Sequence, residues 1–159
     1  MNTIVSLARA AMLGAATGLR SATGVAVVSR GLRSRHWIAG EGGALTAALA
    51  RTEVANALAV VAAGELVADK LPLVPARIEP GPLLWRALLG GVCGAAACSG
   101  RRDRMAAGAL VGAGAAVAAA YGGYHLRRLL TAEGKLPDVA VALAEDAVAI
   151  GASSLAAGL

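Results

Sequence analysis

Charged and aromatic residues are both scarce in this chain of 159 residues. Asp, Glu, Lys and Arg together make up 16% of it, Phe is absent, and aromatic residues make up only 3%. Soluble domains usually carry about 25% charged residues. The deficit indicates that much of the surface does not face water. With so few aromatic side chains, the chain also lacks a stacking platform for bases, which argues against a nucleic-acid partner.

Cysteine is scarce as well, and its positions exclude several kinds of site. Cys93 and Cys98 both lie in an apolar run of Ala and Gly, where we expect small buried residues. Their spacing matches no zinc pattern. The sequence also lacks a P-loop, a dinucleotide-binding fingerprint and a nucleophile–base pattern. We therefore expect no cofactor and no catalytic residue.

Small and apolar residues are abundant instead. The chain contains 21 Gly, and 57% of its residues are hydrophobic. Small residues let membrane helices approach closely, above all as pairs of Gly four residues apart. Three such pairs occur, namely Gly14/Gly18, Gly90/Gly94 and Gly108/Gly112. They predict close packing of the three helices that carry them.

The net charge of +5 raises the question of a nucleic-acid ligand again. The basic residues, however, gather at the ends of apolar runs, as they do in loops that flank membrane spans. These clusters are Arg30, Arg33 and Arg35, then Arg101, Arg102 and Arg104, then Arg127 and Arg128. The distribution favours the lipid bilayer as partner, in the plasma or inner membrane of the cell, with several spans.

Only the run from Met105 to Leu126 is free of charged residues over the roughly 20 residues that a membrane span needs. Every other apolar segment reaches that length by including an ionisable residue. A soluble Ala-rich bundle and a membrane bundle with charges inside both fit this pattern. We favour the membrane bundle, because soluble amphipathic helices carry a fuller polar stripe and intramembrane charges usually face the bundle interior.

The sequence predicts an all-α fold, a polytopic membrane bundle of about six helices in a single domain over 1–159. A short helix or an extension of the next one is expected at Ala44–Ala50, and Pro72 and Pro75 interrupt the chain after the third helix. Polar turns are expected at 30–43 and 101–104. The expected membrane helices are Thr3–Leu19, Ser21–Ser29, Thr52–Lys70, a segment from Pro82 to near Gly100, Met105–Leu130 and a segment from Pro137 onward.

The two halves of the chain resemble each other. Residues 13–18 (LGAATG) are similar to residues 89–94 (LGGVCG), which suggests repeats over 1–70 and 82–159. Two copies of three helices would run in opposite directions across the membrane, as in many transporters. The alternative is that low-complexity Ala/Gly sequence aligns with itself in many registers.

The ionisable residues inside apolar segments are the candidate site. Glu65 and Asp69 lie four residues apart and share one helix face. Glu145 and Asp146 are adjacent, about 100° apart around their helix, so only one can point fully toward the centre. The residues that could balance these carboxylates are Arg20, Lys70 and Arg77. Because an unpaired charge in the bundle is costly, we expect Arg20 to contact at least one of the four carboxylates.

Three roles for this cluster stay open. It could be an interior network that fixes helix packing, or a proton or cation pathway. It could also be a metal site, in which carboxylates alone would suit Mg²⁺ or Ca²⁺, so the metal is left undetermined. His36 and His125, next to Trp37 and Tyr124, are expected at the membrane interface.

Three parts of the sequence carry a resemblance to a known family: residues 18–21 (GLRS), residues 64–77 (GELVADKLPLVPAR) and the Glu145–Asp146 pair. Together they resemble the uncharacterised membrane family named domain of unknown function 4126, over nearly the whole chain. The resemblance implies a small multi-helix membrane protein and supplies no established activity.

Two functions follow as hypotheses. The first is a small transporter or channel, coupled to ions or protons, with the charged cluster at its centre and a small ion or solute as partner. The alternative is a structural or accessory membrane protein whose cluster only fixes helix packing. An enzyme acting on a lipid is a weaker third hypothesis. A chain of this length encloses only a small pore, which makes a homodimer one candidate arrangement.

Overall fold

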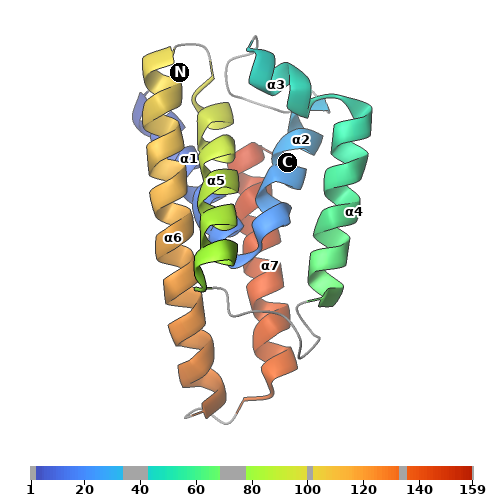
Figure 1. The fold of residues 1–159 in the computed structure, drawn as a ribbon, viewed down its shortest axis with the longest axis vertical. Helices are drawn as coiled ribbons and strands as arrows, with labels where there is room; N and C mark the ends of the chain where they lie inside the picture. Colours follow the sequence, from blue (N-terminus) through green and yellow to red (C-terminus); the bar gives the residue numbers. More distant parts are fainter. Residues whose placement is uncertain (1–2, 34–42, 69–77, 100–101, 133–135, 159) are drawn as a thin grey trace.

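The computed structural model describes residues 3–33, 43–68, 78–99, 102–132 and 136–158. Within these ranges the chain forms seven helices and no strand (Figure 1). The helices are α1 (Thr3–Leu19), α2 (Ser21–Arg33), α3 (Ala44–Leu49), α4 (Thr52–Ala68), α5 (Pro80–Ala97), α6 (Arg102–Ala132) and α7 (Asp138–Ala157). The all-α prediction is confirmed.

Several helices extend into segments expected to be loops. α2 continues to Arg33, so the prediction of a loop from Arg30 was wrong over those residues. α5 begins at Pro80, where the fixed φ of proline suits the first helical turn. α6 begins at Arg102, so residues 102–104 are helical and not a turn. Arginine is a good helix former, and a cluster of basic residues therefore does not by itself end a helix.

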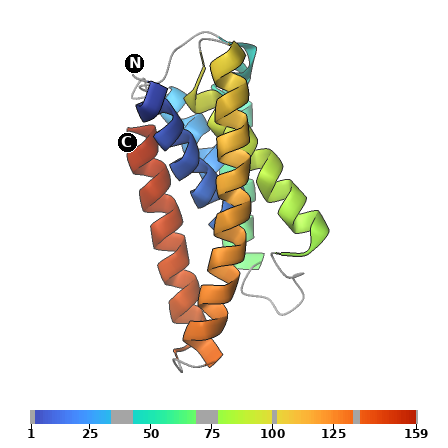
Figure 2. The ribbon, with the colours of Figure 1, turned by 90° about the vertical axis from the view of Figure 1, so that its left-hand side faces the viewer.

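Successive long helices run in opposite directions along the bundle (Figure 1). α1 descends from the N-terminus, α2 returns upward, and α4, α5, α6 and α7 continue the alternation, so both chain ends lie at the upper end in both views (Figure 2). α1 has 17 residues and α2 has 13, whereas α6 has 31. The connection between α1 and α2 therefore lies inside the bundle, partway along α6 and α7.

The Gly pairs hold α1, α5 and α6 together, as predicted. A Cβ atom added to Gly90 of α5 would lie 2.7 Å from the carbonyl oxygen of Gly112 in α6. A Cβ atom added to Gly14 of α1 would meet the same oxygen, and one added to Gly94 would meet the carbonyl of Gly108. Real Cβ atoms do not approach so closely, so these crossings need glycine.

Large apolar side chains lie mostly on the outside, and small or polar ones lie inside. Among the residues that the structure describes, Arg20 is the largest side chain that is fully buried. The exposed fraction reaches 77% for Leu110 of α6, 73% for Leu155 of α7 and 71% for Val60 of α4. In a soluble protein, Leu and Val are more often buried, and Arg is almost never fully buried.

Two of the described helices are long and apolar enough to cross a membrane, over Arg104–Ala132 and Asp138–Ala157. A third apolar helix, α1, is shorter. By length and composition, two of the described helices thus agree with the prediction of about six membrane helices.

Candidate functional site

The candidate site is built around the break between α1 and α2. The backbone amide of Arg20 still donates to the carbonyl of Ala16, at 2.9 Å, and α2 then begins at Ser21. The break brings the C-terminal end of one helix and the N-terminal end of the next into the interior. Each end carries backbone groups without partners in its own helix, together with a partial charge from the helix dipole.

Glu65 of α4 occupies the N-terminal end of α2. Its Oε1 accepts hydrogen bonds from the amide of Ser21 at 2.8 Å and from the Ser21 hydroxyl at 2.5 Å, and its Oε2 accepts one from the amide of Ala22 at 2.7 Å. A carboxylate is favourable there, because it satisfies the amides and opposes the positive end of the helix dipole. The group that caps the start of α2 thus comes from a helix remote in sequence.

Arg86 of α5 occupies the C-terminal end of α1. Its Nη1 donates to the carbonyl oxygen of Gly18 at 2.9 Å, and its Nη2 lies 3.6 Å from Oε1 of Glu65. A cation is favourable at this end for the converse reason. Arg86 is buried and was not among the predicted site residues, although its position inside an apolar segment was a signal that could have identified it.

Arg20 completes the arrangement at the connection itself. Its Nε forms an ion pair with Oδ1 of Asp146 in α7, and its Nη2 lies 3.5 Å from the carbonyl oxygen of Ala142. This confirms that Arg20 contacts one of the four predicted carboxylates. Arg20, Arg86, Glu65 and Asp146 are here called the hairpin network. Two cations and two anions make it neutral overall, which limits the cost of burying charge.

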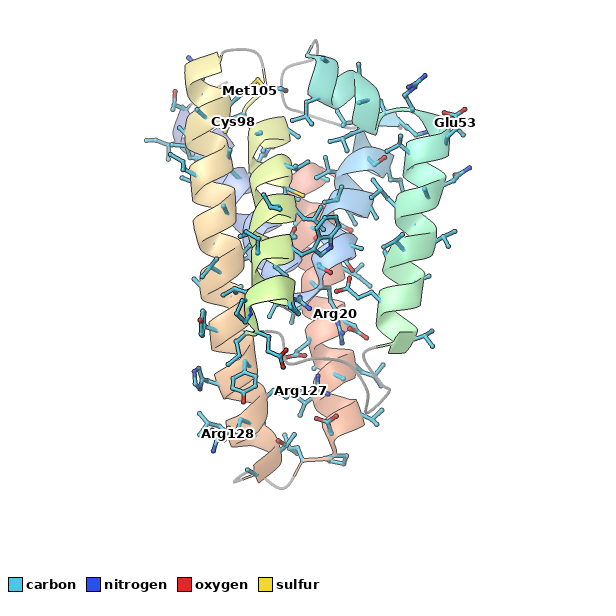
Figure 3. The ribbon with its side chains drawn as sticks, in the orientation of Figure 1. Arg20, Glu53, Cys98, Met105, Arg127 and Arg128 are labelled. Carbon is cyan, nitrogen blue, oxygen red and sulfur yellow. The ribbon has the colours of Figure 1, made fainter. Side chains whose placement is uncertain are left out.

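Glu145 belongs to a second group, at the lower end of α6 and α7. Arg127 donates from Nε to Asp138 Oδ1 at 2.8 Å and from Nη2 to Oδ2 at 2.5 Å, and its Nη1 lies 3.6 Å from Oε2 of Glu145. Figure 3 labels Arg127 below Arg20. As predicted, the adjacent Glu145 and Asp146 point to different places. Among the described contacts, Glu145 thus lies beside Arg127, whereas Asp146 pairs with Arg20.

Three predicted site residues, Asp69, Lys70 and Arg77, lie outside the described residues. The same holds for His36 and Trp37. Tyr124 and His125, by contrast, are described, and their rings meet edge to face with centroids 5.4 Å apart.

The two cysteines are buried and not disulfide-bonded, as expected for small interior residues. At the end of α5, burial raises the pKa of the Cys98 thiol, and the nearby Arg104 opposes part of this shift. Within the described ranges, no three side chains of His, Cys, Asp or Glu are grouped as a metal site would require.

A cavity of about 320 Å³ lies between α2 and α4. None of the four residues of the hairpin network lines this cavity. Comparison of the chain with protein-family models, curated proteins and solved structures found no match.

Proposed function

We propose that this chain is a multi-pass membrane protein of the cell membrane, with α1, α2 and α4–α7 as its six membrane helices and α3 at one surface. The observation that carries this proposal is the burial of Arg20 together with the exposure of large apolar side chains such as Leu110 and Val60. In a membrane, lipid would cover this apolar exterior, whereas in water the same large apolar surface would be exposed to solvent, which is unfavourable.

The length of α2 supports a re-entrant hairpin at α1–α2. At 1.5 Å per residue, the 13 residues of α2 extend roughly 20 Å, which is less than the hydrocarbon thickness of about 30 Å. In this proposal the hairpin enters the membrane and returns to the same side. Backbone that is not helical at that depth is tolerated where protein surrounds it, and the hairpin network supplies the partners.

Within this membrane protein, we propose that the hairpin network is a structural lock, which favours the structural or accessory role. Both oxygens of Glu65 accept hydrogen bonds from the start of α2, and Arg86 lies against one of them. A carboxylate held this way has little remaining capacity for a transported ion. Its bonds join α2, α4 and α5, so they fix how three helices pack.

A small ion- or proton-coupled transporter is the second candidate, and one observation favours it. Discontinuous helices whose ends meet charged groups inside the bundle are typical of transporter binding sites. The break at Arg20 has this form. As part of this second candidate, we also propose that the chain belongs to the family named domain of unknown function 4126 and that its two halves form an inverted repeat. The repeat is supported only by the opposite directions of α1 and α5, of α2 and α6, and of α4 and α7.

Alkaline carbonate extraction tests the membrane proposal. The protein should stay with the membrane pellet, because its apolar exterior is not removed by breaking ionic contacts. A peripheral membrane protein of the same host serves as the control for complete extraction. Release of this chain together with that control would contradict the proposal.

The variant Glu65→Gln separates the two roles, because it preserves shape and removes a charge. If the network is structural, Glu65→Gln should lower the thermal unfolding temperature in detergent. Proteoliposomes with the wild-type protein should then show no proton or cation flux. If it is a transport site, wild-type proteoliposomes should conduct protons or cations under an imposed gradient, and the variant should abolish this flux while remaining folded. Wild-type flux that Glu65→Gln abolishes at unchanged stability would overturn the structural role.

A further inference from the structure

We infer that the cavity between α2 and α4 binds one phospholipid with an anionic head group. The inference rests on the proposed membrane location. The walls of the cavity are mostly small apolar side chains of α2 and α4, together with a few polar side chains. The lining residues are Thr23, Ala26, Val27, Arg30, Arg33, Ala55, Asn56, Ala59, Ala62, Ala63 and Ile150.

The two charged residues of the lining and Asn56 lie at one end of this cavity. Arg30 and Arg33 lie in the last turn of α2, and Asn56 lies in the N-terminal part of α4, at the same upper end of the bundle. Both arginines are exposed, and no described carboxylate forms an ion pair with either. Glu53 lies at the upper end of α4, on its outer side (Figure 3). Two guanidiniums beside an amide are suited to a phosphate diester.

The other end of the cavity carries Thr23 and is otherwise apolar, and the cavity is long enough for an acyl chain. From Arg33 to Thr23 the cavity follows ten residues of α2, about 15 Å at 1.5 Å per residue. This is half of a hydrocarbon core of about 30 Å, or the thickness of one leaflet. A lipid with its phosphate at Arg30 and Arg33 would therefore place one acyl chain along Ala26, Ala59 and Ala63.

The loose packing of α4 leaves room for this occupant. Among the α4 side chains that the structure describes, only Ala55 is buried. Val60, Val61 and Val67 are exposed. A chain of lipid in the cavity would fill the space between α2 and α4, so the lipid would be part of how α4 is held.

Binding of lipids with fluorescent acyl chains tests the inference. Full-length protein in mild detergent is titrated with phosphatidylglycerol and with phosphatidylcholine of the same chains. Because each of the two arginines contributes about 1 kcal/mol of attraction to anionic lipid, and about 1.4 kcal/mol corresponds to a factor of ten, the anionic lipid should bind roughly thirtyfold more tightly. Arg30→Gln with Arg33→Gln should remove this preference. Inorganic phosphate should not compete, which separates a lipid from a free anion.

Matched variants keep the test specific. Arg51→Gln with Arg128→Gln removes two exposed positive charges outside the cavity and should leave the preference intact, as should Arg30→Lys with Arg33→Lys. Ala26→Leu with Ala59→Leu fills the cavity and should weaken both lipids while both arginines remain. Equal affinity of the two lipids for the wild type, or an equal loss in the control pair, would overturn the inference.

A second copy of the chain is the competing occupant. A dimer that Ala26→Leu with Ala59→Leu dissociates, with no lipid preference in the wild type, would assign the cavity to that copy and overturn the inference. The experiment uses only protein that resists carbonate extraction. Its failure would therefore leave the membrane proposal standing.

Discussion

Ser21, the first residue of α2, donates both its backbone amide and its hydroxyl to Oε1 of Glu65, which lies 44 residues further along the chain. A helix N-terminus is usually satisfied by a side chain next to it in sequence. Here the group comes from α4, so the start of α2 depends on tertiary packing.

Glu65→Gln should therefore destabilise the protein more than Ser21→Ala. The first removes the charge that opposes the helix dipole and lies beside Arg86, and we expect a loss of about 2 kcal/mol. The second removes one hydroxyl hydrogen bond, worth about 1 kcal/mol. Chemical unfolding in detergent measures both. The double variant should lose less than the sum, since the two changes share a bond.

Glu53→Gln is the matched control, since Glu53 is an exposed carboxylate in the first turn of the same helix. It should change stability little. If Glu53→Gln and Glu65→Gln had equal effects, the contacts of Glu65 with α2 would contribute nothing to stability.

The ion pair between Arg20 and Asp146 should behave as a buried pair does. Removing one partner, as in Arg20→Met or Asp146→Leu, leaves the other charge in the interior and should cost about 3–5 kcal/mol. The double variant Arg20→Met with Asp146→Leu should recover most of this loss, because it replaces two charges by apolar groups. Denaturant midpoints of the four proteins give the coupling energy, and Arg128→Met controls for loss of an exposed arginine. Additive single effects would contradict the pairing.

The crossing of α5 and α6 should not tolerate a methyl group. Gly112→Ala places one against the carbonyl of Gly90, and the overpacking should cost about 1–3 kcal/mol. Gly114→Ala, two residues along α6, meets nothing within 4 Å and should gain up to about 1 kcal/mol from helix propensity. Thermal unfolding followed by circular dichroism should shift in opposite directions for the two variants. A parallel shift would show that the crossing is not tight.

The lower ends of α6 and α7 should depend on Arg127 and not on its neighbour Arg128. Arg127→Gln loses the two bonds to Asp138 and the contact with Glu145, whereas Arg128 is exposed. Since the Asp138 side chain is 64% exposed, the loss should be only about 1 kcal/mol. The thermal unfolding difference between Arg127→Gln and Arg128→Gln should shrink in about 1 M NaCl, where screening is strong. Equal unfolding temperatures at low salt would contradict the role of Arg127.

Much of this arrangement could be predicted from local sequence, for physical reasons. The Gly pairs predicted the crossings of α1, α5 and α6, because only glycine permits such close backbones. The cost of an unpaired charge predicted a carboxylate for Arg20, and the angular separation of Glu145 and Asp146 predicted that they would diverge. These arguments need only helix geometry and electrostatics.

The contacts of Glu65 and Arg86 could not be predicted in the same way. Each side chain satisfies backbone groups at an end of another helix, and backbone groups are the same at every position in a sequence. Which carbonyl or amide is left without a partner depends on where α1 ends and where α4 and α5 pack. The sequence therefore showed Arg86 only as a further charge in an apolar segment, and it did not predict that Arg86 donates to the carbonyl of Gly18.

The position of Arg20 has a consequence for how the protein is made. The carbonyl of Ala142 that its guanidinium reaches is synthesised 122 residues later. At about 5–20 residues per second, a ribosome takes on the order of ten seconds to cover that distance. During this time α1 and α2 carry an arginine that has neither Ala142 nor Asp146 to contact. The hairpin should therefore be less stable in nascent chains that stop at Ala132 than in chains that include α7, and chemical unfolding of stalled chains of the two lengths would measure this difference.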